Sequence, residues 1–303
     1  MSIVEKAVEK LKALPAEAAP TPSAEPAPAV PVRAASTVER LQERARTVDQ
    51  PVETVPPWRV DLDALRRMGL LPGDDTAERR LADEMRGIKR PLLANAMDKG
   101  ADTHPRGKRI MVTSAEAGEG KTFAAVNLAL SLAREADVEV LLVDGDIPKS
   151  DITRIFGLNG KPGLMDVLAD EKLAPTDVIV PTDVPNLLVV PAGQRHLLAA
   201  ELFRSRRMDH VLDEFGARNR RRLLVFDSSP LLATSESQVL ASHMGQVVMV
   251  VAAGRTGRQV VASALRRMGD LPYVGLLLNM SSLAGENDYS GYSHYLRALK
   301  GGV

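Results

Sequence analysis

The residues of this chain best suited to chemistry gather in one glycine-rich segment, residues 114–122. Gly118 and Gly120 lack a Cβ, so the backbone there can curl until successive N–H groups and the start of a following helix point at phosphate oxygens. Lys121 would place a positive charge between the β- and γ-phosphates, and the hydroxyl of Thr122 is a suitable ligand for Mg²⁺. The segment therefore predicts a site for ATP or GTP.

The segment departs from the usual pattern G-x-x-x-x-G-K-[ST] at one position, because Ala115 stands where the first glycine belongs. Its surroundings still favour a phosphate-binding loop over an ordinary glycine turn, since an apolar run precedes it and an amphipathic helical pattern follows it. We expect the nucleotide to contact a continuous stretch of this loop, namely Ala117, Gly118, Glu119, Gly120, Lys121, Thr122 and Phe123.

Two further apolar runs end in carboxylates. The first leads into Asp144 and Asp146, and the second ends at Asp227. A carboxylate at such a position can hold Mg²⁺ through its water shell. Taken alone, Asp227 also fits an ordinary acid in a turn after a strand. Beside the glycine loop and the acidic pair, it predicts a role in binding a metal and a nucleotide.

Apolar runs and helical segments alternate from residue 109 onward, and these elements must position the chemistry. Strands are predicted at about 109–113, 139–144, 186–191, 221–227, 246–252 and 274–279. Continuous runs rich in Val and Leu are typical of strands buried on both faces, so we expect a doubly wound, mostly parallel α/β sheet. Ligands bind at the carboxyl ends of such strands. The glycine loop, Asp144 and Asp227 all fall there.

The chain before this sheet divides into three parts. Residues 1–14 predict a short amphipathic helix, for which docking on its own domain or on a partner protein is favoured over binding to a membrane surface. Residues 15–57 are rich in Pro and Ala and predict a disordered linker. The domain itself is predicted over residues 58–303, with helices at about 61–68 and 75–99, the second kinked or interrupted at Pro91.

Composition excludes several classes of function. Lys and Arg together number 39, as do Asp and Glu, so the formal net charge is zero and does not favour nucleic acid as a partner. There is no cysteine, which excludes disulfides and thiolate metal sites, and the five histidines show no metal-ligand spacing. No apolar stretch has the length of a membrane span or of a signal peptide, so the sequence predicts a cytoplasmic protein.

Three motifs together resemble those of the bacterial protein-tyrosine kinases (BY-kinases), in particular the cytoplasmic autokinases of exopolysaccharide loci, including the exosortase-associated ones. They are residues 113–122, the acidic pair Asp144-Gly-Asp146, which resembles the family's additional Walker A′ motif, and residues 226–231. The resemblance covers about residues 75–300 and also the opening Ile3 to Lys6. It implies the ParA/MinD-like type of P-loop fold. ParA and MinD proteins carry a signature lysine where this chain has Glu116, which favours the kinase branch.

The resemblance implies ATP and Mg²⁺ as cofactors and a role for each site residue. Lys121 would neutralise charge on the transferred phosphate, Thr122 and Asp144 would hold Mg²⁺, and Asp227 would orient the water shell of the metal. Asp146 would be the base for the acceptor phenol, and Asn279 would contact the adenine ring. The sequence departs from the family at Pro148-Lys149, where arginine is frequent, and at Ser228-Ser229, where proline is. Neither departure removes a metal ligand.

Three of the four tyrosines lie at three-residue spacing near the carboxyl end: Tyr289, Tyr292 and Tyr295. They resemble the family's tyrosine cluster, which implies that the tail, residues 286–303, is the phosphate acceptor. Surface aromatics on a final helix are the alternative. Asp83, Arg86 and Lys89 resemble, with conservative changes, the family's Glu-x-x-Arg-x-x-Arg motif, which joins subunits into a ring. A solvated charged helix face is the alternative there.

The resulting hypothesis is an ATP-dependent tyrosine autokinase that phosphorylates its own tail in trans and regulates exopolysaccharide synthesis or export. The resemblance implies an integral-membrane polysaccharide co-polymerase as activating adaptor, peripheral attachment to the inner membrane through that partner, a homo-oligomer and a cognate tyrosine phosphatase. Two alternatives stay open at this point. One is a MinD/ParA-like ATPase switch without kinase activity, and the other is a nucleotide-binding scaffold.

Overall fold

The computed structural model describes residues 56–97, 106–217, 219–269, 271 and 273–281. The predicted N-terminal helix and nearly all of the predicted linker lie outside the described residues, as does the tyrosine tail. The statements that follow concern the described part of the chain.

A seven-stranded sheet forms the centre of the domain, in the order β3-β4-β2-β5-β1-β6-β7. All neighbouring pairs are parallel except β3 and β4, which are antiparallel. The strands are β1 (Arg109–Ser114), β2 (Glu139–Gly145), β3 (Val180–Pro181), β4 (Leu187–Val190), β5 (Arg222–Ser228), β6 (Gln246–Ala252) and β7 (Val274–Asn279). The six predicted strands are confirmed to within one residue at either end. Two-residue β3 lacks a periodic pattern and was not predicted.

The central strands β1, β2, β5 and β6 are buried along nearly their whole length. Successive side chains of a strand point to opposite faces, so burial on both faces requires an apolar residue at almost every position. Two apolar clusters result, one on each face of the sheet. Continuous apolar runs in the sequence are therefore the direct consequence of a sheet covered on both sides.

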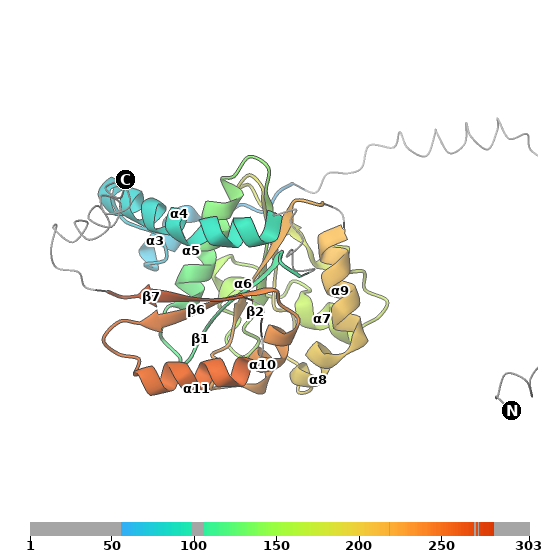
Figure 1. The fold of residues 1–303 in the computed structure, drawn as a ribbon. Coiled ribbons are helices and arrows are strands. Elements are labelled where there is room, and N and C mark those ends of the chain that lie inside the picture. The colour runs from blue at the N-terminus through green and yellow to red at the C-terminus, as the bar shows by residue number, and fades with distance from the viewer. Residues whose placement is uncertain (1–55, 98–105, 218, 270, 272, 282–303) are drawn as a thin grey trace, which may run out of the picture. The chain divides into compact units, whose positions relative to one another are not determined.

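Helices cover both faces of the sheet (Figure 1). α3 (Leu62–Arg67), α4 (Asp75–Met97) and α5 (Lys121–Ala133) lie over one face, whereas α10 (Ser235–Ser242) and α11 (Arg258–Met268) lie over the other. The remaining helices are α6 (Asp151–Ile155), α7 (Leu164–Ala169), the 3₁₀ helix η1 (Pro175–Val178), α8 (Ala199–Arg204) and α9 (Arg206–Ala217). This is the doubly wound α/β arrangement that the sequence predicted.

Helix α4 continues through Pro91, so of the two predicted effects of this proline, a kink or an interruption, the interruption is wrong. Buried side chains on both sides of the proline, Met85 before it and Leu92 and Ala96 after it, belong to the apolar cluster shared with α5. Their packing outweighs the loss of one helical hydrogen bond at Pro91. The cost of a proline within a helix is predictable from sequence, whereas the packing that offsets this cost is not.

Candidate active site

The glycine loop takes the backbone conformation that a phosphate-binding loop requires. It connects the end of β1 to α5, whose N-cap is Gly120. Gly118 has a φ of 82° and Gly120 a φ of 88°, a left-handed region that strains residues with a Cβ. A Cβ on Gly120 would also lie 2.1 Å from Nδ2 of Asn279 and would displace that amide group. The backbone conformation at position 120 therefore favours glycine, and the contact with Asn279 adds to this preference.

Three aspartates lie side by side at the carboxyl ends of β2 and β5. Asp144 and Asp227 occupy paired positions of these neighbouring strands, and Asp146 follows two residues after Asp144. Their exposed fractions are 0%, 0% and 1%. Three buried carboxylates in one place are costly unless cations or hydrogen-bond donors face them.

Two residues of α5 supply part of that compensation. Nζ of Lys121 lies 2.6 Å from Oδ2 of Asp146 as a buried ion pair. The Thr122 hydroxyl donates a 2.7 Å hydrogen bond to Oδ2 of Asp227. The structure thus brings Lys121 and Thr122 together with the acids that the sequence singled out.

Two further residues, which sequence reasoning missed, hold the acids in place. Asp144 accepts hydrogen bonds at Oδ2 from the backbone N–H of Thr153 at 2.8 Å and from its hydroxyl at 2.6 Å. Ser229 donates from its hydroxyl to Oδ1 of Asp146 at 2.7 Å. The position of Ser229 directly after the Asp227 strand was a usable signal. Thr153, within α6, gave none.

Burial sets the protonation behaviour of two acids. It raises the pKa of Asp144 to about 6, although the hydrogen bonds from Thr153 act in the opposite direction. It raises the pKa of Asp227 to about 7, against the opposing effects of Lys121 and Thr122. Burial alone would lower the pKa of Lys121, but Asp227 and Asp146 outweigh it and raise that pKa above its ordinary value. Lys121 is therefore a cation at neutral pH.

The acids fit a divalent cation. Oδ1 of Asp144 and Oδ1 of Asp227 are buried and accept no hydrogen bond within the described structure. Oδ2 of Asp146 also lacks a hydrogen bond of good geometry, but it has the ion pair with Lys121. The described residues form no cage of three or more ligands for a metal ion. Mg²⁺ fits such a partial site, since it commonly takes one or two carboxylates together with phosphates and waters.

The side chain of Glu119 is buried and hydrogen-bonded within the protein, so it is not free to make the predicted contact with a nucleotide. It is only 2% exposed. Its carboxylate accepts hydrogen bonds from the backbone N–H of Glu116 at 2.6 Å, from the Thr256 hydroxyl and from the N–H of Ala252 at 3.4 Å. Glu119 thus ties the loop to the turn after β6, which leaves its backbone as the part that could contact a phosphate.

Asn279 is also bound to the loop. Its side-chain nitrogen donates a 2.9 Å hydrogen bond to the backbone carbonyl of Glu119. The predicted adenine contact would have to come from the rest of this amide group. Phe123, at the first turn of α5, is half-buried.

The three charged residues of the motif on α4, Asp83, Arg86 and Lys89, differ in exposure. Arg86 pairs with Asp83 at 2.6 Å, and both side chains are largely exposed. Lys89 is only 12% exposed, because its Nζ pairs with Glu135 at 2.6 Å and donates to the carbonyl of Ser131 at 3.0 Å. Lys89 is therefore engaged within its own subunit, and Asp83 and Arg86 are left as the accessible part of the motif.

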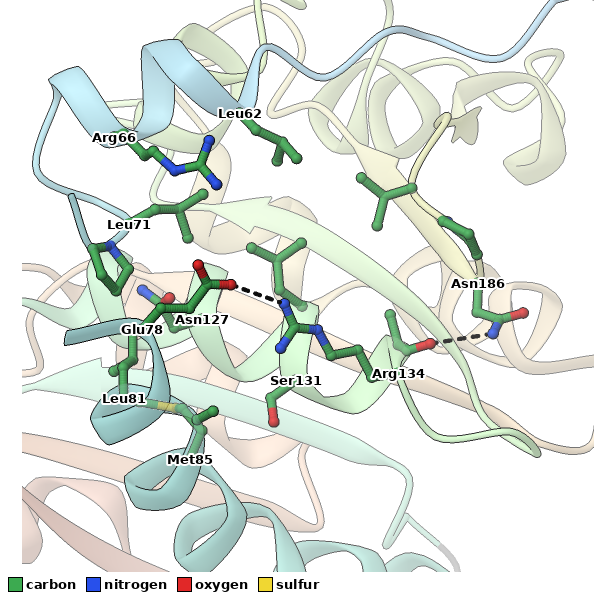
Figure 2. Close-up of a pocket in the computed structure, with 16 residues that line it drawn as sticks. Leu62, Arg66, Leu71, Glu78, Leu81, Met85, Asn127, Ser131, Arg134 and Asn186 are labelled. Carbon is green, nitrogen blue, oxygen red and sulfur yellow. Dashed lines mark hydrogen bonds and ion pairs between the residues drawn. The ribbon is translucent and has the colours of Figure 1, made fainter. Parts of the chain in front are cut away.

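A separate pocket of about 460 Å³ lies between α3, α4, α5 and the turn before β4 (Figure 2). Leu71, Leu81 and Met85 line it from one side. An ion pair of 3.6 Å between Arg134 and Glu78 crosses it. Arg134 follows the last residue of α5, whereas the phosphate loop precedes its first, so the pocket and the candidate active site lie at opposite ends of this helix.

The fold and the strand-tip site define a P-loop NTPase of the ParA type. A family model described as ParA, NUBPL iron-transfer P-loop NTPase, matches residues 106–296, which is more than half of the chain. The chain belongs to this family and, within it, to the bacterial tyrosine-protein kinases. Members of the family bind nucleotides through the loop described above.

Similarity to known tyrosine-protein kinases supports placing the chain among them. The chain is 30% identical over 198 residues to tyrosine-protein kinase CpsD of Streptococcus agalactiae, covering 64% of this chain and 85% of that protein. It is 29% identical over 187 residues to tyrosine-protein kinase YwqD of Bacillus subtilis (strain 168), covering 61% and 77%. The crystal structure of the VpsO kinase domain has a TM-score of 0.56 and 29% identity, and the match covers 68% of this chain and 98% of that domain.

Other matching kinases are much longer than this chain. Tyrosine-protein kinase wzc of Salmonella typhi is 29% identical over 188 residues, but the match covers only 26% of that protein. Within the described residues, no helix has the length and apolar character needed to cross a membrane.

Proposed function

We propose that this chain binds ATP with Mg²⁺ and transfers the γ-phosphoryl group to the tail tyrosines of another copy of itself. The observation that carries the proposal is the buried group of Lys121, Thr122 and three aspartates at the strand tips. Phosphoryl transfer depends chiefly on positioning and on stabilising negative charge. A lysine, a hydroxyl and carboxylates with unused oxygen atoms are the groups that this chemistry needs.

In this proposal the loop amides and Lys121 hold the β- and γ-phosphates. Thr122, Asp144 and Asp227 hold Mg²⁺ directly or through its waters. The metal, when bound, neutralises charge on the phosphates. Asp144 is suited to this role because Thr153 occupies one of its oxygens and leaves the other free.

Asp146 is the proposed base. The phenol oxygen of the acceptor forms a bond to the γ-phosphorus, the bond from that phosphorus to the bridging oxygen breaks, and ADP leaves. The phenol proton passes to a carboxylate oxygen of Asp146. Ser229 orients this carboxylate through its hydrogen bond, and Lys121, now held by Asp146, would turn toward the phosphates.

The acceptors in the proposal are Tyr289, Tyr292 and Tyr295. A tail that reaches another copy requires contact between copies, and Asp83 and Arg86 are an accessible charged pair on α4 that would take part. From the resemblance to exopolysaccharide-locus kinases, and from relatives such as wzc that are several times longer than the matched region, we also infer an activating membrane adaptor and a role in polysaccharide synthesis or export.

Incubation of the full chain with Mg-ATP, followed by mapping of phosphorylated residues, tests the proposal. The expected result is phosphate on the tail tyrosines and none in a Lys121→Met variant. ATP hydrolysis without phosphotyrosine would instead support the ATPase switch. Nucleotide binding with neither product would support the scaffold.

A further inference from the structure

Two leucines on a turn beside the candidate base are exposed without apparent cause. Leu197 is 102% exposed and Leu198 54%. They belong to the turn between β4 and α8. Because β4 is the parallel neighbour of β2, this turn begins at the sheet edge that also carries Asp144 and Asp146. Exposed apolar side chains next to a functional site commonly mark a contact surface.

Hydrogen bonds hold the start of this turn, residues 192–194. The N–H of Ala192 donates to the Thr153 hydroxyl at 2.8 Å, and the N–H of Gln194 donates to Asp166 at 3.3 Å. A Cβ on Gly193 would lie 2.3 Å from a carboxylate oxygen of Asp166. The start of the turn is thereby fixed against α7 and α6.

A direct contact joins this turn to the segment that carries Asp146. The Arg195 guanidinium donates to the backbone carbonyl of Pro148. Ser150 closes the segment by donating from its N–H to the carbonyl of Asp146 at 2.7 Å, and Lys149 between them is exposed. Lys149 and Arg195 thus lie on two segments that this contact joins, and Leu197 and Leu198 follow Arg195 on the turn; we name these four residues the acceptor platform.

We propose that the acceptor platform binds residues 286–295 of a second copy of this chain and so delivers a tail tyrosine to Asp146. This proposal rests on the proposed kinase function. The segment contains Glu286 and Asp288 immediately before Tyr289, with Tyr292 and Tyr295 after it. Its acids complement Lys149 and Arg195, and its aromatic rings suit exposed leucines. The acids near the platform are Glu201 at the start of α8, Asp166, which accepts from the N–H of Gln194, and Asp151, which pairs with Arg154.

A mixing experiment tests the apolar half of the platform. The kinase copy carries Tyr289→Phe, Tyr292→Phe and Tyr295→Phe, and the acceptor copy carries Lys121→Met. Adding Leu197→Ser to the kinase copy should raise the KM for the acceptor copy about tenfold, since one leucine side chain loses its burial. The KM for ATP should not change. Leu197→Ser in the acceptor copy should have no effect. Met68→Ser, at an exposed position on α3's carboxyl end, is the matched control.

Charge reversal tests the basic half. Lys149→Glu in the kinase copy should raise the KM for the acceptor several-fold, and Glu286→Lys with Asp288→Lys in the acceptor should restore it. A merely structural role for Lys149 would not allow this rescue. The kinase copy and the acceptor copy without platform substitutions should give efficient phosphorylation. If they do, and Leu197→Ser and Lys149→Glu leave the KM for the acceptor unchanged, the platform proposal is wrong and the kinase function stands.

Peptide binding separates the two proposals further. A fluorescent peptide with the sequence of residues 284–298 should bind the full chain in the presence of Mg-ADP, and Leu197→Ser should weaken that binding about tenfold. Such binding would support the platform even if no phosphate were transferred. In that case only the proposed kinase function would be wrong. Equal binding by the parent chain and by Leu197→Ser would overturn the platform.

Discussion

Two of the three aspartates each have one occupied and one unused oxygen, and this asymmetry defines the site at the scale of residues. Thr153 takes one oxygen of Asp144, and Thr122 takes one oxygen of Asp227. The unused oxygens are buried acceptors that a metal ion would satisfy. Thr153, which binds Asp144 but is not itself a proposed ligand, would therefore orient that acid toward a metal ion.

Thr153→Val tests this orientation. The change keeps the backbone N–H but removes the hydroxyl that donates to Asp144 at 2.6 Å and accepts from Ala192. We expect the Mg²⁺ concentration for half-maximal autophosphorylation to rise by roughly tenfold or more, as is usual when the support of a metal ligand is lost. Thr153→Ser, which retains the hydroxyl, should behave like the parent chain. Equal Mg²⁺ dependence of the two variants would contradict the role given to Thr153.

The raised pKa of Asp227 predicts how stability depends on pH in the nucleotide-free chain with EDTA. Its pKa moves from 3.8 to about 7 on folding, so the folded state holds a proton that the unfolded state releases. The free energy of unfolding therefore falls as the pH rises, and this loss occurs between about pH 4 and about pH 7. Urea unfolding should show a free energy about 2 kcal/mol lower at about pH 7.5 than at about pH 5 from this group.

Asp227→Asn supplies the comparison. The amide can still accept the hydrogen bond from Thr122 but does not titrate, so the pH dependence of unfolding should become markedly flatter. A variant with the same pH dependence as the parent chain would show that Asp227 is not the group responsible. Lys121 stays charged throughout this range and should contribute no slope.

At the scale of elements, the glycine loop is fastened at its apex to the turn after β6. Glu119 makes this connection through its buried carboxylate, and Asn279 adds a second bond from the end of β7. The loop is thereby shaped before a nucleotide arrives, which lowers the ordering cost of binding. Preorganisation of this kind does not follow from the loop sequence alone.

Glu119→Ala should therefore weaken ATP binding although the side chain is buried and hydrogen-bonded within the protein. We expect the Kd to rise by about tenfold, because hydrogen bonds to a buried charged group are lost and the N–H of Glu116 is left without its acceptor. Fluorescence titration with a labelled nucleotide measures this. Glu171→Ala, at an exposed acid in the α7–η1 connection, should leave the Kd unchanged. Equal Kd values for ATP in Glu119→Ala and Glu171→Ala would contradict the proposed role of Glu119 in shaping the loop.

Much at this scale could be predicted from sequence, and the failures have a common cause. Strands were predictable because burial on both faces forces continuous apolar runs, and strand-end acids followed from parallel topology. Glu119 and Thr256 are 137 residues apart and meet only in the folded sheet. Thr153 likewise meets Asp144 only through the packing of α6 on β2. No local pattern encodes such contacts, and none encodes the packing that carries α4 through Pro91.

At the scale of the whole molecule, transfer in trans predicts a concentration dependence. Tail phosphorylation per chain should accelerate as chain concentration rises, because each event needs two copies. Initial rates over a dilution series measure this. A rate per chain that does not vary with concentration would indicate transfer within one copy, or within an oligomer that does not dissociate on dilution.

Mixing Lys121→Met with the tail variant that carries phenylalanines separates those two explanations. Neither chain can phosphorylate itself, so phosphate on the tail of the Lys121→Met chain requires transfer between copies. The charge pair of Asp83 and Arg86 can be examined in the same mixture, where Arg86→Glu should slow transfer if this part of α4 lies between copies.

We have proposed that loop amides, Lys121 and the strand-tip acids bind a nucleoside triphosphate together with a divalent cation. Calorimetric titration of the full chain with ATP, in the presence and absence of Mg²⁺, measures this most directly. We expect one-to-one binding that Mg²⁺ strengthens, and that Lys121→Met weakens by at least about tenfold. Absence of binding heat at several temperatures, or an affinity indifferent to both Mg²⁺ and Lys121, would contradict it.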